Sequence, residues 1–481
     1  MSPVVPEPLL RELGRTEGGS EALGLLVRDQ HTRRLVLLRA LLDAASAAPA
    51  AVCPPGRLDR LRQDWALLEA AERADRAAAR SVLLHPLAGP WAQRCLRGLT
   101  AAVPTPELAA DLAHFSALAA AAAIRAGLPF QARLTAPDGL LVLPTLGALR
   151  TGPGTATAVD IAQADGEVTL RQQGAGAVTV RLGEDGTPSA GPRSGDPRWL
   201  PVLTLPAVLP GTAPVPLDDL DPYRTAGSGL QRFGLSSVAG LDARERAAWR
   251  ELWDGVAPML RIGGAHRTAE TAALLRCLVP LSPPPGSTSP GSPSVGSTGT
   301  GSPSTREGAA QCSGTRREAF GAILSSRPAT AAHFASTLVH ELQHTKLAAL
   351  AALTPLHHED ATPRHFAPWR PDARPFDGLL QGAYSHIALA DYWQRCALGA
   401  DRPSARDPAW AEHARCQEQV GAVLPVLAAS GALTPEGRVL VNEMISMYHR
   451  LADTPPPPGH LARAVAYVRT ARMIWRQRNA S

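Results

Sequence analysis

The sequence is organised around residues 330–353, TAAHFASTLVHELQHTKLAALAAL, which contain the pattern H-E-x-x-H. Ala and Leu are frequent in this stretch and neither Pro nor Gly occurs, so it predicts a helix with Thr330 as its N-cap. His340 and His344 are four residues apart, so both imidazoles project from one face of that helix. Two histidines at this spacing can bind one metal ion, and Glu341 on a neighbouring face can act as a general base.

The composition argues against several classes of partner. The net charge is only +5 over 481 residues, and no basic run is interleaved with aromatic residues, so we expect no nucleic-acid binding. The six cysteines are scattered without a C-x-x-C pair, which argues against a disulfide framework or a zinc ribbon. The sequence has neither a signal-peptide pattern nor an apolar run of about 18 residues. We therefore expect a cytoplasmic protein that does not contact a membrane.

Periodicity and composition divide the chain into five segments. They are an N-terminal helical region (1–135), a small β region (136–215), a helical segment leading into a strand (216–282), a disordered Pro/Gly/Ser/Thr insert (283–306), and the metal-site region with the C-terminal helices (307–481). In the first segment we expect long helices at residues 20–45, 58–79 and 107–126. The fold class expected is α+β, predominantly α-helical with a small antiparallel β region, and with the metal site between two packed helices.

Three local patterns carry weaker expectations. Residues 275–281 and 319–324 read as strands, and we expect them to pair as a hairpin whose loop has grown. The acidic run at residues 217–224 favours capping and solvated turn roles over a cation site. His85 is isolated in the sequence, which favours an exposed or hydrogen-bonded histidine.

A second helix is expected at about residues 377–396, after an irregular connection. His386 is the polar member of an otherwise apolar stripe on this helix, together with Leu379, Leu389 and Trp393. A lone histidine on such a face is usually a hydrogen-bonded core residue. Because a two-histidine helix lies shortly upstream, we favour His386 as a third metal ligand, with other His or carboxylate donors as alternatives.

Four blocks of sequence between residues 319 and 394 resemble a bacterial family of HExxH-motif peptide-modification proteins. The blocks are AFGA (319–322), LVHELQHTKL (338–347), APWRPDARP (367–375) and GLLQGAYSH (378–386). The spacing of several blocks makes this likeness more specific than the pentapeptide alone. The likeness covers roughly 75 residues, and we find no such motif in the rest of the chain.

The resemblance implies an iron(II)- and α-ketoglutarate-dependent dioxygenase that hydroxylates the β-carbon of a side chain in a ribosomally synthesised precursor peptide. His340, His344 and His386 would then hold the iron and leave positions for the keto acid and dioxygen, with Glu341 or Asp377 as alternative donors. The distal carboxylate of α-ketoglutarate needs a cation that can bind it through two hydrogen bonds. The resemblance places Arg370 or Arg374 in that role.

Two other functions remain open from the sequence. The first is a zinc metallopeptidase in which Glu341 activates a metal-bound water. The chain lacks the extended pattern H-E-x-x-H-x-x-G-x-x-H, and its second helix offers His386 where a thermolysin-like enzyme has a glutamate. The second is a metal-free scaffold or peptide-binding module.

Overall fold

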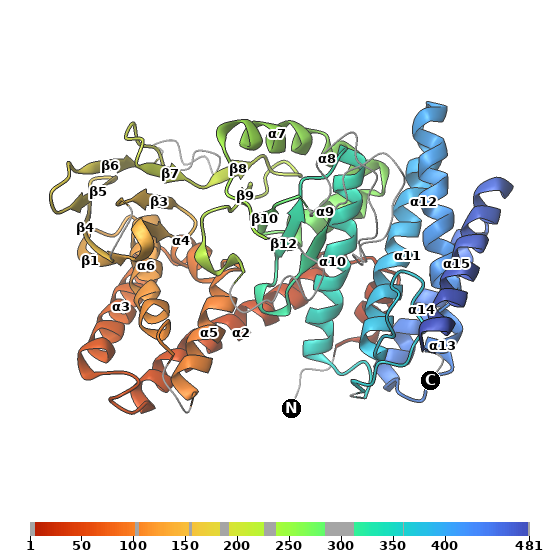
Figure 1. The fold of residues 1–481 in the computed structure, drawn as a ribbon, viewed down its shortest axis with the longest axis horizontal. Helices are drawn as coiled ribbons and strands as arrows, with labels where there is room; N and C mark the ends of the chain where they lie inside the picture. The colour runs from red at the N-terminus through yellow and green to blue at the C-terminus, as the bar shows by residue number, and fades with distance from the viewer. Residues whose placement is uncertain are drawn as a thin grey trace.

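The computed structural model describes residues 5–101, 105–152, 156–182, 192–225, 237–283, 312–358 and 360–479. Helices predominate, and the strands form three small sheets. Figure 1 shows an elongated molecule with the helices of residues 55–125 and two of the sheets at one end, the third sheet in the middle and the C-terminal helices at the other end. The expected α+β, mainly helical class is confirmed.

Six helices form the N-terminal region: α1 (Glu7–Gly14), α2 (Ser20–Ala47), α3 (Pro55–Ala74), α4 (Arg76–Leu83), α5 (Ala88–Thr100) and α6 (Leu108–Arg125). The prediction of one helix over residues 58–79 is wrong. The chain leaves the helical conformation at Asp75, which has a φ of −149° and accepts a hydrogen bond from the Ala78 amide as the N-cap of α4. Within the described residues, α6 alone is long and apolar enough to cross a membrane, but 72% of it is buried inside this region, so it is a core helix.

Two antiparallel sheets follow, as expected for a small antiparallel β region, and they pack on this region through contacts of α6 with β1 and β2. The first has the order β1 (Phe130–Ala136), β4 (Thr157–Ala164), β5 (Glu167–Gln172), β6 (Val178–Arg181). The second has the order β2 (Leu140–Leu143), β3 (Gly147–Arg150), β7 (Trp199–Pro201), with the 3₁₀ turn η1 (Pro137–Gly139) before β2. Val159 and Ile161 on β4 alternate with exposed residues, so one face of the first sheet packs into the core.

The central sheet has the order β11 (Ser313–Thr315), β12 (Ala322–Ser326), β10 (Cys277–Leu281), β9 (Val215–Leu217), β8 (Leu203–Leu205). The predicted hairpin between residues 275–281 and 319–324 is wrong, because β10 and β12 run parallel, with Cys277 opposite Ala322. The strand β11, which precedes β12, takes the antiparallel position on its other side. The predicted disordered insert at residues 283–306 lies, apart from Pro283, outside the described residues.

Between β9 and β10 the structure describes three α-helices: α7 (Ala243–Asp254), which contacts β8, then α8 (Val256–Ile262) and α9 (Ala265–Leu274). Asp242 caps α7 with a full capping box. Its carboxylate accepts from the Glu245 amide, while the Glu245 side chain accepts from the Asp242 amide. Short 3₁₀ turns, η2 (Pro222–Arg224) and η4 (Arg317–Ala319), lead out of β9 and into β12.

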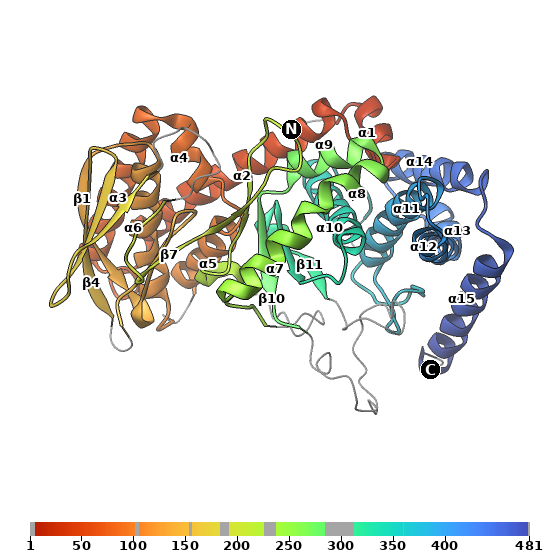
Figure 2. The same cartoon turned by 90° about the horizontal axis from the view of Figure 1, so that it is seen from above.

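The C-terminal half is a helical bundle: α10 (Ala331–Leu353), α11 (Phe376–Leu398), α12 (Pro403–Gly421), α13 (Leu424–Ala428), α14 (Pro435–Ala452) and α15 (Pro458–Asn479). Thr330 caps α10 as expected, by accepting from the His333 amide. Figure 2 shows α1 beside α14, where Arg11 binds Glu443 across 2.8 Å. The first helix of the chain is therefore part of the C-terminal packing.

The helices α10 and α11 pack antiparallel. His344 contacts Gln381 near one end of the contact, and the Tyr392 hydroxyl donates to the Ala332 carbonyl near the other end. The connection between them, residues 354–375, is irregular as expected and turns the chain back along α10. This pairing gives the two predicted histidine stripes a common interface.

Candidate functional site

The two histidines of the H-E-x-x-H pattern meet on one face of α10. The Nε2 atoms of His340 and His344 are 3.1 Å apart, and the ring centroids are 4.7 Å apart. The Nδ1 of His344 lies 3.2 Å from Oε1 of Gln381 on α11. If Nδ1 carries the proton and donates it to this oxygen, Nε2 is unprotonated and can bind a metal ion. The Nδ1 of His340 is buried, and no described residue forms a hydrogen bond with it.

His386 faces this pair from α11. Its side chain is buried, and its ring centroid lies 5.4 Å from that of His340. The ring stacks on Trp369 with centroids 4.5 Å apart, and Nδ1 lies 2.8 Å from the Gly382 carbonyl. A proton on Nδ1 is thereby bound to the backbone, which leaves Nε2 of His386 unprotonated.

The three imidazoles form an open arrangement. No choice of one ring nitrogen from each of His340, His344 and His386 brings all three within 4.8 Å of one another. His340 and His344 are therefore already at ligand spacing, and His386 stands further back against Trp369. The metal site that we expected between two packed helices remains a prediction.

Burial keeps His340 and His386 neutral. Together with the positive charge of Arg415, it lowers the pKa of His386 to about 3. Burial also lowers the pKa of His340, and His344, His386 and Arg415 add to the effect. The neutral imidazole is the form that binds metals, so the site is held in its binding form at neutral pH.

Glu341 lies beside the pair on the next face of α10. Only 3% of its surface is exposed, and its Oε1 accepts a hydrogen bond of 2.7 Å from the Ser313 hydroxyl on β11. Burial raises the pKa of Glu341, although His344 and Ser313 oppose the shift. This carboxyl is thus both oriented by the central sheet and easier to protonate than an exposed glutamate.

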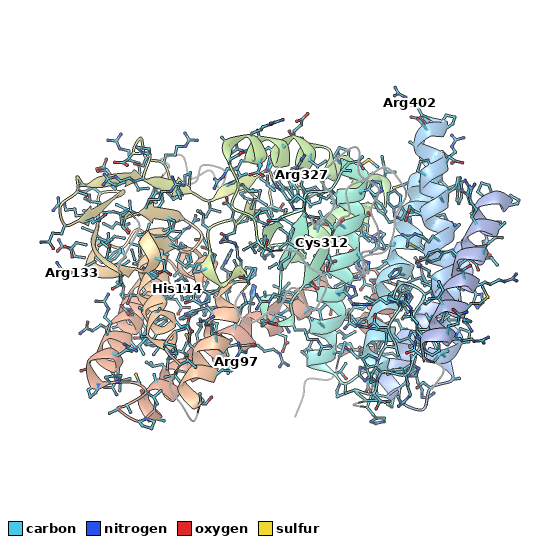
Figure 3. All side chains as sticks on the ribbon, viewed as in Figure 1. Arg97, His114, Arg133, Cys312, Arg327 and Arg402 are labelled. Carbon is cyan, nitrogen blue, oxygen red and sulfur yellow. The ribbon has the colours of Figure 1, made fainter. Side chains whose placement is uncertain are left out.

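All four of these side chains line a cleft of about 1630 Å³ between α2, β11, α10 and α11. Cys312, labelled in Figure 3, also lines the cleft where β11 begins. The volume exceeds that of a typical small-molecule pocket, so the cleft can hold an extended peptide segment beside a small cosubstrate.

Both predicted arginines reach this cleft. Arg370 and Arg374 lie on the connection before α11, and both contact Asp372, at 3.2 and 3.4 Å. The Nε of Arg374 is buried and has no hydrogen-bond partner among the residues that the structure describes. The alternative donor Asp377 also lines the cleft, but its carboxylate is bound by Arg317 at 2.7 Å and by His357 at 3.4 Å.

Sequence reasoning missed Arg415. This residue enters the cleft from α12, where its guanidinium pairs with Glu412 and donates to Oε1 of Gln419 at 3.2 Å. Its charge acts on both His340 and His386. No local signal marks it, because α12 is a separate helix and its arginine reaches the cleft only through the packing of α12 on α11.

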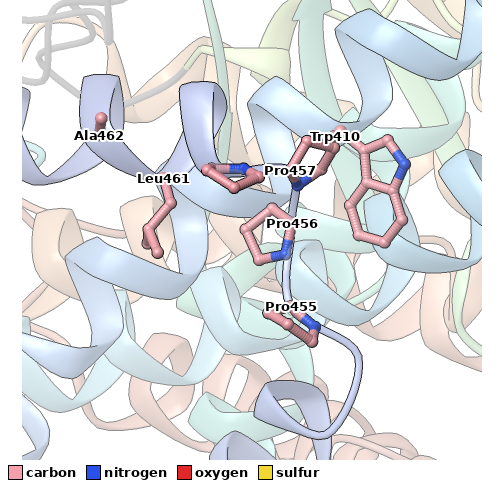
Figure 4. Close-up of a pocket in the computed structure, with 7 residues that line it drawn as sticks. Trp410, Pro455, Pro456, Pro457, Leu461 and Ala462 are labelled. Carbon is pink, nitrogen blue, oxygen red and sulfur yellow. The ribbon is translucent and has the colours of Figure 1, made fainter.

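A second cleft of about 580 Å³ lies between the proline run at residues 455–458 and Trp410 of α12 (Figure 4). Leu461 and Ala462 complete its lining. It contains no titratable side chain, so we assign no chemistry to it.

Comparison with family models and with curated proteins finds no match for this chain.

Proposed function

We propose that this protein is an iron(II)- and α-ketoglutarate-dependent dioxygenase. It hydroxylates the β-carbon of a side chain in a ribosomally synthesised precursor peptide, in the cytoplasm. The observation that carries the proposal is the convergence of His340, His344 and His386 in one cleft. The four sequence blocks quoted above supply the reaction class, since histidine ligands alone are shared by many metalloenzymes.

The residues present fit a bound metal ion. Two ligands at right angles and about 2.1 Å from one ion lie about 3.0 Å apart, and the Nε2 atoms of His340 and His344 are 3.1 Å apart. His386 would become the third ligand if its ring moved from Trp369 toward that pair. Bound iron(II) and keto acid would supply the chemistry by which dioxygen, the oxidant, puts one oxygen atom on the peptide carbon while the keto acid is oxidised to succinate and CO2.

The positive charges of the cleft suit the keto acid. Its distal carboxylate needs a guanidinium that donates two hydrogen bonds, which Arg370, Arg374 or Arg415 can provide. The unpartnered Nε of Arg374 favours this residue on hydrogen-bonding grounds. The charge of Arg415 acts on two of the three histidines, which favours it by position.

One observation favours a second candidate, a zinc metallopeptidase. Glu341 lines the same cleft and has a raised pKa, as a general base working near neutral pH requires. The Ser313 hydroxyl occupies one of its oxygens, which is better suited to orienting the glutamate than to leaving it free for water. We therefore keep the dioxygenase as the main proposal.

The test is to add iron(II) and then α-ketoglutarate to the metal-free protein under anaerobic conditions and to record the visible spectrum. We expect a metal-to-ligand charge-transfer band that requires both additions and is lost in His340→Ala. His333→Ala is the matched control, because it removes an imidazole from the same helix, two turns away. A spectrum without this band, from a protein that retains zinc on purification, would favour the peptidase.

Glu341→Gln separates the two functions further. The substitution keeps the size of the side chain and its contact with Ser313 but removes the general base. A peptidase should lose its activity, by a factor of about 10² or more. The keto-acid band of a dioxygenase should survive.

A further inference from the structure

A second cluster of metal-binding side chains lies outside the cleft. His85, Asp218 and Cys277 each offer one donor atom, and these three atoms all lie within 4.8 Å of one another. Within the part of the chain that the structure describes, no other group of three or more His, Cys, Asp or Glu residues meets this spacing. All three residues are buried, with 5%, 1% and 0% of their surfaces exposed.

The fold explains why these residues meet. The strands β9 and β10 run parallel with Leu217 opposite Leu278, so Asp218 and Cys277 follow the same alternation and point to the opposite face of the sheet. That face packs against Leu87, two residues after His85. The turn between α4 and α5 therefore carries the imidazole onto the sheet surface where the carboxylate and the thiol emerge.

The histidine lacks any partner that would explain its burial. Neither Nδ1 nor Nε2 of His85 makes a hydrogen bond with the described residues. Burying a polar side chain without a partner is costly, so native structures almost always satisfy such groups. A bound cation would satisfy one nitrogen of this imidazole directly.

The neighbouring charges leave the cluster available to a cation. Arg34, a buried arginine beside it, donates to the carbonyls of Leu84 and His85 at 2.9 and 2.6 Å rather than to Asp218. The Oδ1 of Asp218 accepts from the amides of Leu220 and Asp221. These bonds fix the orientation of the carboxylate, as is usual for a metal-binding aspartate.

The acidic run was expected to have capping and solvated turn roles. The capping role is confirmed, since Asp218 and Asp221 both accept backbone N–H groups. The solvated role is wrong, because Asp218, Asp219 and Asp221 are all buried. A buried pair of carboxyls near one histidine and one thiol is an expensive arrangement unless a positive charge offsets it.

We propose that His85, Asp218 and Cys277 bind one Zn²⁺ ion that fastens the turn between α4 and α5 to the central sheet. Imidazole nitrogen, carboxylate oxygen and thiolate sulfur are all zinc ligands, with bonds of about 2.0 to 2.3 Å. Tetrahedral bonds of that length place the donors about 3.3 to 3.8 Å apart, which the observed spacing allows. On binding, the thiol of Cys277 gives up its proton to solvent. This site is independent of the function proposed for the cleft.

The test uses cobalt as a spectroscopic substitute in the full chain, produced in cobalt-supplemented medium and kept reduced. A cobalt–thiolate bond gives a near-ultraviolet charge-transfer band, whereas the histidine cleft can give such a band only through Cys312. We expect the band in the native sequence, in Cys312→Ala and in His340→Ala. We expect its loss in Cys277→Ala, while Cys95→Ala, which removes another fully buried thiol, retains it.

Two results would overturn the proposal. One is a folded native chain without the thiolate band, and the other is a band that persists in Cys277→Ala and disappears in Cys312→Ala. If Cys277→Ala fails to fold, X-ray absorption of zinc in the native chain decides the question. One sulfur scatterer at about 2.3 Å supports the site, and a shell of nitrogen and oxygen alone refutes it.

Discussion

The buried carboxylate of Glu270 should be one of the most sensitive positions in the fold. It lies on α9 with 1% of its surface exposed and forms ion pairs with Lys346 of α10 and with Arg267, the latter at 3.2 Å. Burial alone would raise the pKa of Glu270, but Lys346 and Arg267 together hold it below its usual value. Glu270→Gln removes the charge that both buried cations require.

The loss of stability in Glu270→Gln depends on the partners that Arg267 and Lys346 retain. Arg267 retains Asp391 at 3.5 Å and the Thr16 carbonyl at 2.7 Å, and Lys346 retains the Thr16 and Glu17 carbonyls. Breaking a buried ion pair by removing one partner typically costs 3–5 kcal/mol. Because the retained bonds offset part of this, we expect a loss of about 3 kcal/mol, or roughly 150-fold in the unfolding equilibrium.

The assay is guanidinium unfolding at pH 7, followed by the fluorescence of the nine tryptophans. The matched control is Asp43→Asn, which neutralises the carboxylate of an exposed ion pair with Arg39 and should leave the midpoint unchanged. The double variant Glu270→Gln/Lys346→Met should lose less unfolding free energy than the sum of the losses of the two single variants. A loss below about 1 kcal/mol for Glu270→Gln, or strict additivity with Lys346→Met, would refute the reasoning.

Three further predictions concern the helices α10 and α11 and a buried histidine of α12. A Cβ on Gly382 would lie 2.2 Å from Cζ2 of Trp369, so Gly382→Ala should displace the indole from His386 and destabilise the fold by about 1–3 kcal/mol. It should also weaken metal binding measured by titration, and an unchanged metal affinity would contradict this. Burial lowers the pKa of His413, so the unfolded chain binds a proton at this histidine before the folded chain does as the pH falls below about 6.5. The stability of the fold should therefore rise with pH below this value. His413→Gln should flatten that rise in denaturant midpoints measured from pH 5 to 7. Thr330→Ala removes the cap of α10 and should cost about 1 kcal/mol in thermal or denaturant unfolding, while Thr330→Ser should restore most of it.

The helices of the cleft could be predicted because their signals are local. Apolar periodicity, a capping threonine and the absence of breakers place α10 within a residue of its observed bounds. The stripe through His386 indicates the face that α11 turns toward the cleft, although α11 is buried on its other faces as well. That His340, His344 and His386 face one another follows from two antiparallel helices with these stripes.

Contacts between distant segments could not be predicted in the same way. A short apolar strand has no sequence pattern that distinguishes parallel from antiparallel pairing. For this reason β10 and β12 were expected to form a hairpin. Arg415 reaches the cleft only because α12 packs on α11, and His85 reaches Cys277 only because a turn crosses the central sheet. Such long-range contacts depend on tertiary packing, and the periodicity of a single sequence does not predict them.

The strand order of the central sheet also sets how much chain is needed between β10 and β11. Leu281 at the end of β10 lies opposite Ser326, and Cys312 at the start of β11 hydrogen-bonds to the same Ser326 from the other side. The strand β12 lies between the two ends, so they are two strand spacings apart, about 10 Å. Three or four extended residues can span this distance. The thirty residues between them, 282–311, greatly exceed this need, so the closure of the sheet does not set the length of this junction, and a shorter segment or one with an inserted domain would still join the two strands.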